Sequence, residues 1–418
     1  MRTEQADPCV LMIAYHFPPL AGSSGIQRTL RFVQQLPTLG WQPVVLTTQL
    51  RAYERVSNDL VRDVPPQTPV RRAFALDAAR HMSVGGRYVG ATARPDRWAS
   101  WQFDGVRQGL KLIKEFRPRA IWSTFPIPTA HLIAAQLHRR SGLPWVADFR
   151  DPMAQVGYPA DPKLWAAFDQ LERQTIDLAS ASIFTTPGAA RMYRDRYPSR
   201  ADRIGVLENG YDEESFVAAE LADPSRTPLI PGLTTLLHSG IVYPAERDPS
   251  QLMLALQRLK AAGQLSASDF RLRFRASVHD ELLQSLARQH QVTDLIETLP
   301  AISYVQALRE MRCADALLVM QSSGCNEQIP AKVYEYLRAG RPMLCLSDPS
   351  GDTAGVLREA KLPDIARLDD AADIERTLMR FVHAVRGGRA ALPDAASVKR
   401  ASRHCRSADL AALLNRLA

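Results

Sequence analysis

Residues 327–342 read Glu-Gln-Ile-Pro-Ala-Lys-Val-Tyr-Glu-Tyr-Leu-Arg-Ala-Gly-Arg-Pro. Two carboxylates, Glu327 and Glu335, have seven residues between them. Pro330 lies where a helix can begin, because proline fits the first helical turn and needs no backbone donor there. The pattern therefore predicts that Glu327 lies on a loop and that Glu335 lies inside the helix that follows.

The predicted anion site lies at the start of this helix, around the backbone of Ile329, Pro330, Ala331 and Lys332. Free amides at the positive end of a helix dipole bind phosphate well, although proline itself has no donor to offer. The order of carboxylate, anion site and carboxylate matches a sugar, its diphosphate and a ribose. The alternative is a pair of solvated carboxylates at an ordinary helix start.

This segment resembles the E-x7-E motif of retaining GT-B glycosyltransferases of family 4, in the form typical of bacterial polysaccharide enzymes. In that family the first Glu contacts the transferred sugar and the second binds the ribose hydroxyls of the nucleotide. The resemblance implies these roles for Glu327 and Glu335. It also implies an α/β chain of the GT-B fold, in which two Rossmann-like, doubly wound parallel-sheet domains face a central cleft.

Short apolar runs alternate with helical patterns along the chain, which is typical of α/β proteins. We expect an N-terminal, acceptor-side domain over residues 1–216 and a donor-binding domain over 234–395. The segment between them, 217–233, has the proline-rich, polar composition of a linker. By the resemblance, residues 396–418 form a helix that crosses back to the first domain.

The first predicted strand, residues 9–15, leads into a Pro-Pro sequence and a glycine-containing loop. The loop lacks G-x-G-x-x-G, so it gives little support for a dinucleotide site. It resembles the family loop that faces the donor diphosphate and the acceptor, with Ser23 or Ser24 in place of one glycine. The resemblance implies that Gly22 and Ser23 bind the donor and that His16 lies on the acceptor side. The alternative is a plain tight turn.

The sequence Asp-Phe-Arg-Asp-Pro, residues 148–152, follows a predicted strand. Charges at the carboxyl end of a parallel strand lie where α/β sheets bind ligands. The cluster resembles the same bacterial subgroup, so Asp148 and Asp151 are candidate catalytic residues and Arg150 is a candidate acceptor-side residue. The alternative is an internal ion pair between Arg150 and an aspartate. Asn209, in an Asn-Gly turn, matches the family's exit from the first domain and is also predicted on the acceptor side.

Ser239 and Gly240 follow the first strand of the second domain, and Arg247 precedes its first helix. Family 4 members usually place an Arg and a Lys here to hold the donor diphosphate. This chain has only Arg247 clearly placed, and Lys332 is the candidate for the second positive charge. A guanidinium suits a diphosphate leaving group because it is permanently charged and can bind in a bidentate way.

The alternative for Arg247 is a surface pair with Glu246 or Asp248. The chain contains no Asp-x-Asp, P-loop or Gly-x-Ser-x-Gly sequence, and no Cys/His cluster with zinc spacing. We therefore expect no metal and no cofactor, with a nucleotide-diphosphate sugar as donor substrate. Charge on the leaving group would be met by Arg247, Lys332 and the helix start.

The chain has 418 residues and a formal net charge of +8, with many of its basic residues between Arg51 and Arg119. Nucleic acid, an anionic membrane surface and a solvated surface are the three explanations. No nucleic-acid-binding motif is present, so we expect no nucleic-acid partner. An anionic membrane surface is the predicted further partner, with Trp98 and Trp101 as candidate interfacial anchors.

No apolar run approaches the length of a membrane span, and residues 1–8 do not resemble a signal peptide. The five scattered cysteines are simplest to explain as reduced cytosolic thiols. These features predict a cytoplasmic protein that binds peripherally at the inner face of the membrane.

The predicted reaction is metal-independent transfer of a sugar, of the hexosyl type, to a hydroxyl acceptor with retained configuration. The acceptor would be a saccharide or lipid-linked saccharide in cell-surface polysaccharide biosynthesis. A GT-B-fold nucleotide-sugar epimerase, recognised by donor turnover without acceptor, is one alternative. A non-catalytic nucleotide-sugar binding subunit is the other. The nucleotide base, the sugar, the acceptor, any general base and the oligomeric state stay open.

Overall fold

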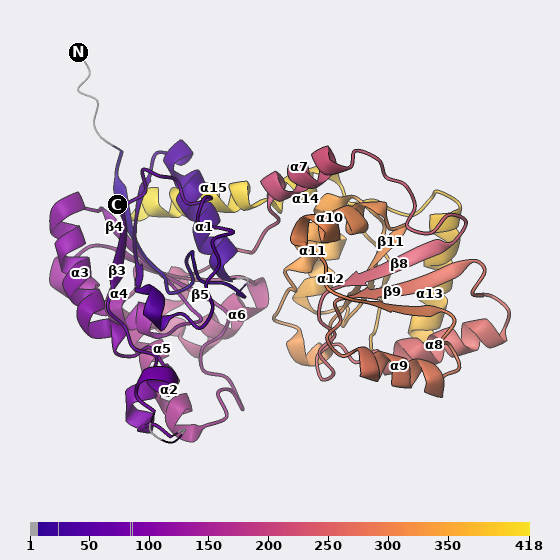
Figure 1. The fold of residues 1–418 in the computed structure, drawn as a ribbon, viewed down its shortest axis with the longest axis horizontal. Coiled ribbons are helices and arrows are strands. Elements are labelled where there is room, and N and C mark those ends of the chain that lie inside the picture. Colours follow the sequence, from indigo (N-terminus) through magenta and orange to yellow (C-terminus); the bar gives the residue numbers. More distant parts are fainter. Residues whose placement is uncertain (1–6, 24, 84, 86) are drawn as a thin grey trace, which may run out of the picture. The chain divides into compact units, whose positions relative to one another are not determined.

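The chain forms two compact α/β units in a computed structural model that describes residues 7–23, 25–83, 85 and 87–418 (Figure 1). The first unit contains the residues up to Glu208 together with His404–Ala418, and the second contains Asn209–Arg403. The segment 217–233, predicted as a linker, begins inside a helix of the second unit and ends where the first strand of that unit begins.

The first unit is built on a sheet of seven strands in the order β3-β2-β1-β4-β5-β6-β7. Every neighbouring pair in this sheet is parallel. The strands are β1 (Cys9–Ile13), β2 (Gln42–Thr48), β3 (Val70–Ala73), β4 (Ala120–Thr124), β5 (Trp145–Arg150), β6 (Ala181–Phe184) and β7 (Ile204–Val206).

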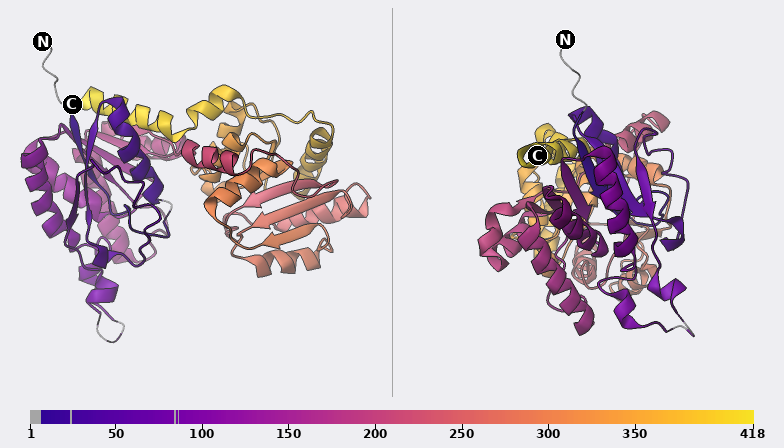
Figure 2. Two further views of the ribbon diagram at one scale, coloured as in Figure 1. Left: turned by 45° about the horizontal axis from the view of Figure 1, so that its top comes forward. Right: turned by 90° about the vertical axis from the view of Figure 1, so that its left-hand side faces the viewer.

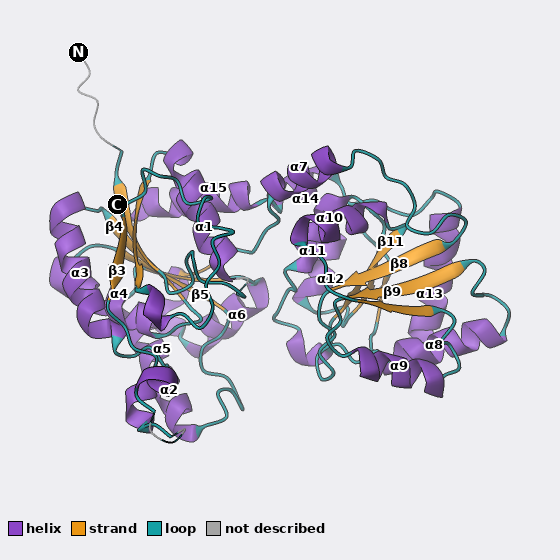
Figure 3. Cartoon of the chain, viewed as in Figure 1, coloured by secondary structure: helices purple, strands orange, loops and turns teal. Residues whose placement is uncertain are grey.

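Helices lie on both faces of this sheet, as Figure 3 shows. They are α1 (Gly25–Gln35), α2 (Ala78–His81), α3 (Trp101–Phe116), α4 (Thr129–Ser141), α5 (Pro162–Leu178), α6 (Pro187–Arg196) and α15 (Arg403–Leu417). Short 3-10 turns are η1 (Leu36–Leu39), η2 (Leu50–Ala52), η3 (Gly90–Ala93) and η4 (Pro198–Arg203).

The second unit repeats the plan with a parallel sheet of six strands in the order β10-β9-β8-β11-β12-β13. Its strands are β8 (Thr234–Ser239), β9 (Phe270–Arg275), β10 (Ile296–Leu299), β11 (Ala316–Met320), β12 (Met343–Leu346) and β13 (Ile365–Ala366). Its helices are α7 (Glu213–Ala222), α8 (Ser250–Ala261), α9 (Asp280–Gln289), α10 (Tyr304–Cys313), α11 (Lys332–Ala339), α12 (Asp352–Glu359), α13 (Ala371–Arg386) and α14 (Ala395–Arg400), with the 3-10 turn η5 (Ser323–Cys325).

Both sheets have the strand order of Rossmann folds, with a seventh strand added in the first unit. The expected fold class of two Rossmann-like, doubly wound parallel sheets is therefore confirmed. In such sheets ligands bind outside the carboxyl ends of the strands, where the strand order reverses. That point lies between β1 and β4 in the first unit and between β8 and β11 in the second.

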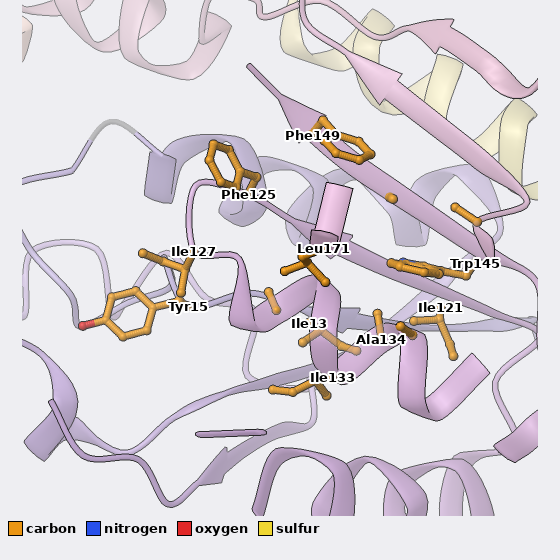
Figure 4. Close-up of a cluster of buried hydrophobic side chains, with 14 of the residues drawn as sticks. Ile13, Tyr15, Ile121, Phe125, Ile127, Ile133, Ala134, Trp145, Phe149 and Leu171 are labelled. Atoms are coloured by element: carbon orange, nitrogen blue, oxygen red, sulfur yellow. The ribbon is translucent and has the colours of Figure 1, made fainter. Parts of the chain in front are cut away.

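The core of the first unit is a continuous cluster of buried apolar side chains between the sheet and its helices (Figure 4). Ile13, Ile121 and Trp145 come from adjacent strands, whereas Ile133 comes from α4. Parallel strands that are covered on both faces read as continuous apolar runs. This explains why β1 and β4 could be recognised from sequence.

Two tryptophans expected at a membrane surface belong to this interior. Trp101 is fully buried at the start of α3. Trp98 is partly buried, its indole N–H donates to the Ala52 carbonyl at 3.0 Å, and its ring packs on Tyr15. The prediction of Trp101 as an interfacial anchor was wrong, because an alternating polar and apolar sequence does not reveal on which side of a helix a protein core lies.

Helix α15 returns to the first unit at the end of the chain (Figure 2, yellow). Leu410 and Leu414 are buried in the cluster that contains Val10 and Trp122 of the sheet. Polar contacts add to this packing, because the Trp41 indole N–H donates to Asn415 and the Ser407 hydroxyl donates to Gln35. The tail predicted as one helical stretch is two helices, which residues 401 and 402 separate.

Candidate functional site

The motif of residues 327–342 lies at the carboxyl ends of β11 and β8. Helix α11 has Ala331 as its N-cap, so it begins slightly later than Pro330 would allow. Glu327 lies on an exposed turn after η5, and Glu335 lies in the first turn of α11. The expected placement of one carboxylate on a loop and the other inside a helix is therefore confirmed.

The first turn of α11 closes partly on itself. The Val333 amide donates to the Pro330 carbonyl at 2.9 Å, and the Tyr334 amide donates to the Ala331 carbonyl at 3.2 Å. Ile329 is largely buried in the core of the second unit. The amides of Ala331 and Lys332 come before these bonds, so they are the donors that the helix start can offer to an anion.

Lys332 has an unusual partner for a lysine. Its Nζ atom lies 3.0 Å from Nε2 of His238, a fully buried residue of β8. The other ring nitrogen, Nδ1, lies 3.0 Å from the Leu318 carbonyl, which fixes it as the N–H that donates. Burial and the positive charge of Lys332 lower the pKa of His238 well below its ordinary value, so the imidazole is neutral.

The charge of Lys332 is poorly balanced. Burial and the positive charge of Arg247 lower the pKa of the Lys332 ammonium to about 7, and Glu335 only partly opposes this. Gly240, with φ of +113°, makes the close approach possible, because a Cβ atom there would lie 3.0 Å from Nζ of Lys332. The Gly240 amide is held by the Arg275 carbonyl at 2.8 Å. This arrangement places an ammonium where a bound anion would stabilise its charged form.

Arg247 lies beside this ammonium and is oriented by the loop after β8. Its Nη1 donates to the Ile241 carbonyl at 2.8 Å, and its guanidinium lies 5.0 Å from the ring centroid of Tyr243. Among the described residues, its buried Nε has no hydrogen-bond partner and no ion pair joins Arg247 to Glu246 or Asp248. The alternative of a surface pair with a neighbouring acid is therefore not found among these residues, and the guanidinium retains capacity for a ligand.

Glu335 lies close to Lys332. Tyr304, at the start of α10, donates its hydroxyl to Oε1 of Glu335 at 2.7 Å. Burial raises the pKa of Glu335, and the Tyr304 hydrogen bond and the charges of Arg403 and Lys332 oppose this rise. Ser239 joins the group through its amide, which donates to the Tyr336 hydroxyl of α11 at 2.8 Å. The second unit thus brings together Glu335, Lys332, Arg247, Ser239 and Gly240, whereas the predicted donor residues Gly22 and Ser23 belong to the first unit.

The first unit has its own charged cluster at the end of β5. Asp148 is fully buried and accepts two hydrogen bonds from Arg28 of α1, at 2.8 and 3.0 Å. Arg28 also donates to the carbonyls of Leu207 and Glu208 at the end of the unit's last strand. Because this pairing occupies both oxygens of Asp148, we assign Asp148 a structural role. A catalytic role stays a prediction for Asp151, which is exposed.

Arg150, the last residue of β5, adopts φ of +61° and donates from Nη1 to the Phe125 carbonyl at 3.3 Å. Its guanidinium approaches the start of α1, where a Cβ atom on Gly25 would lie 2.7 Å from Nη1 and 2.5 Å from Nδ1 of His16. Burial and the charge of Arg150 lower the pKa of His16 to about 4. The predicted acceptor-side residues His16 and Arg150 are therefore neighbours, which only the glycine at position 25 permits.

The remaining predicted residues lie nearby or in the other unit. Gly22 has φ of +81°, and Ser23 Oγ accepts from the Gly25 amide at 3.2 Å and lies 3.3 Å from His16. Ser24 lies outside the described residues. Asn209 is the first residue of the second unit, whereas His16 and Arg150 belong to the first unit.

Sequence reasoning missed three residues that organise these sites. Arg28, His238 and Tyr304 each contact a predicted residue that is distant in the sequence. His238 at the end of a buried strand carried a usable signal, because a buried histidine needs partners. Within the part of the chain that the structure describes, no group of three or more His, Cys, Asp or Glu residues could hold a metal ion, and no helix is long and apolar enough to cross a membrane.

Part of the chain matches a known protein family. Residues 24–210 match the family described as glycosyl transferase 4-like domain. A search of curated protein sequences found no match. Among solved structures, sucrose-phosphate synthase (tll1590) from Thermosynechococcus elongatus is 11% identical, with a TM-score of 0.66 over 98% of this chain and 99% of that chain.

Two other solved structures are similar over nearly their full length. Anabaena Alr3699/HepE in complex with UDP is 11% identical, with a TM-score of 0.66 over 98% of this chain and 100% of that chain. The lipopolysaccharide outer core galactosyltransferase WaaB in its apo form is 12% identical, with a TM-score of 0.60 over 97% of this chain and 99% of that chain. The first unit thus contains a match to the glycosyl transferase 4-like domain, and the whole chain has the GT-B fold of these solved glycosyltransferases.

Proposed function

We propose that this glycosyltransferase moves a sugar from a nucleotide-diphosphate sugar to a hydroxyl acceptor, with retention of anomeric configuration and without a metal. The observation that carries the proposal is the pair of cations, Arg247 and Lys332, of which Lys332 also lies near Glu335. Two cations that lack a carboxylate ion-pair partner would be stabilised by a ligand with two negative charges, such as a diphosphate.

The groups around this pair divide the donor into three parts. Arg247, Lys332 and the amides at the start of α11 would stabilise the departing diphosphate, as charge develops on it during transfer. Glu335 would accept hydrogen bonds from the ribose hydroxyls through the oxygen that Tyr304 does not occupy. Glu327, on the exposed turn before α11, would contact the transferred sugar.

UDP and UDP-sugars are the first donors to test, because solved structures of Anabaena HepE contain UDP, UDP with glucose, and UDP-glucose. For the acceptor side we propose His16, Arg150 and Asp151 of the first unit, together with Asn209. The acceptor would be a saccharide or lipid-linked saccharide of cell-surface polysaccharide biosynthesis, presented at an anionic membrane surface on the cytoplasmic side.

The test is a calorimetric panel of UDP, GDP, ADP and their sugar conjugates on wild type and Glu335→Ala. We expect one nucleotide to bind selectively and to bind more weakly to the variant. Transfer with the selected donor would then be followed by NMR of the product's anomeric proton, with and without a chelator. Failure of every nucleotide to bind would overturn the proposal, and an inverted product or loss of activity with chelator would overturn its retaining or metal-independent part.

A further inference from the structure

Two segments of the first unit expose large apolar side chains at the same end of that unit. One contains α2 and η3, and the other runs from the loop after β5 into the start of α5. We call the described residues of 80–94 and 154–165 the tip patch. Its exposed apolar side chains are Met82, Tyr88, Val89, Val156, Tyr158 and Trp165. Val156 is fully exposed and Val89 is 70% exposed.

The two segments are neighbours. Figure 1 draws α2 and α5 together at the lower end of the first unit. The pKa of Asp161, the N-cap of α5, is lowered by the backbone amides of Leu164 and Lys163 and also by the positive charge of Arg94. A charge that acts from one segment on the other requires that they lie close together.

The backbone of each segment is held by hydrogen bonds, so the exposed side chains stand on ordered supports. In the first segment the Met82 amide donates to the Ala78 carbonyl at 3.2 Å and the Thr92 amide donates to the Val89 carbonyl at 2.9 Å. Gln155 and Tyr158 bond to each other across the turn that carries Val156, and the Trp165 indole N–H donates to the Gln155 carbonyl at 2.7 Å. The apolar groups are therefore presented to solvent at fixed positions.

The charge of the tip patch has one dominant sign. Residues 80–94 and 154–165 contain four Arg or Lys residues and one Asp, a formal charge of +3. Arg87 and Lys163 are exposed, each within two residues of an exposed apolar side chain. Aromatic residues with one polar end, such as Tyr158 and Trp165, suit the headgroup level of a bilayer.

We propose that the tip patch docks the protein on an anionic lipid surface. Apolar tips would enter the headgroup region, and the basic residues between them would meet the lipid charges. A protein partner fits less well, because the apolar side chains stand on separate loops interspersed with basic residues, whereas the core of a protein interface is depleted in charge. This proposal rests on the membrane part of the proposed function. It assigns the membrane contact to the tip patch in place of Trp98 and Trp101.

The test is co-sedimentation of the full chain with phosphatidylcholine vesicles, with and without phosphatidylglycerol, at low and high salt. We expect binding only to the anionic vesicles and release by salt. Replacing Arg87 and Lys163 by Ser should weaken binding by about fivefold for each charge lost. Replacing Val89 and Val156 by Ser should weaken it at least as much, and thermal unfolding should stay that of wild type because these two side chains are largely exposed.

Matched controls lie on α3 of the same unit. Phe103→Ser removes a side chain that is 76% exposed, and Lys111→Ser with Lys114→Ser removes two exposed charges. These changes should leave vesicle binding unchanged. The proposal is overturned if wild type ignores anionic vesicles, if the controls weaken binding equally, or if the tip variants instead abolish self-association in sedimentation velocity. Nucleotide binding, measured without vesicles, reports separately on the proposed function.

Discussion

Nζ of Lys332 lies 3.0 Å from Nε2 of His238, so the cation at the start of α11 is held by a neutral imidazole and not by a carboxylate. A carboxylate partner would keep the ammonium charged in the empty protein. An imidazole positions the amine without neutralising it. The charge at this site is therefore left to be balanced by a ligand, and the predictions for proton uptake and for Gly240 depend on that relationship.

Donor binding should take up protons. The pKa of Lys332 is about 7 in the free protein, and a bound diphosphate would raise it because a nearby anion favours the charged ammonium. Affinity for UDP-glucose should therefore fall as pH rises above about 7, by at most tenfold per pH unit. Calorimetry at about pH 8 in buffers of different ionisation enthalpy measures the uptake. Lys332→Met should abolish it, and uptake equal to zero in wild type would contradict the assignment.

Gly240→Ala should weaken donor binding. The new Cβ would lie 3.0 Å from Nζ of Lys332, and φ of +113° is strained for any residue with a side chain. Displacing the ammonium should lower affinity for the nucleotide by about tenfold, which is about 1.4 kcal/mol. Strain should also lower stability by about 1–3 kcal/mol.

Gly263→Ala is the matched control for this substitution. Gly263 also has a positive φ, of +68°, but a Cβ atom there would meet no other atom within 4 Å. It should therefore lose stability without losing nucleotide affinity. Equal losses of affinity in both variants, measured by titration with UDP, would show that backbone strain and not contact with Lys332 is responsible.

Glu335→Gln should reduce discrimination between UDP and its 2′,3′-dideoxy analogue, because a neutral amide oxygen is a weaker acceptor than a carboxylate. A hydrogen bond from a hydroxyl to a charged acceptor contributes about 1.5–3 kcal/mol, so wild type should prefer UDP by roughly tenfold to a hundredfold. Tyr304→Phe removes the donor that lies 2.7 Å from Oε1 and should reduce the preference only partly. Binding constants of both ligands, measured for wild type and each variant, give this preference. A preference of the same size in Glu335→Gln as in wild type would place the ribose elsewhere.

Asp148→Asn should unfold the first unit more easily without abolishing nucleotide binding. The change removes the charge of the buried carboxylate that accepts two hydrogen bonds from Arg28, at a cost of about 3–5 kcal/mol. Asp169→Asn, which breaks an exposed pair with Arg173, should cost about 0.5 kcal/mol or less. Denaturant unfolding measures both. An unchanged stability combined with loss of sugar transfer would restore a catalytic role for Asp148.

Local patterns in the sequence determined much of this protein. Strands buried on both faces read as continuous apolar runs, which is why β12 was predicted with the bounds that the structure has, Met343–Leu346. Short edge strands such as β3 and β13 were missed, since they are less apolar or only two residues long. Glu327 was predicted on a loop and Glu335 in a helix because Pro330, which lies between them, favours a helix start.

Tertiary structure alone decided which charges are available to a ligand. Arg28 takes both oxygens of Asp148 although 120 residues separate them, and His238 holds Lys332 across 94 residues. No local pattern encodes such pairs, because they arise only when helices and strands pack into one core. The sequence by itself thus determined the fold class and the residues that carry charge. Packing decided that Asp148 pairs with Arg28 and that Arg247 and Lys332 have no carboxylate partner, which leaves both cations available to a ligand.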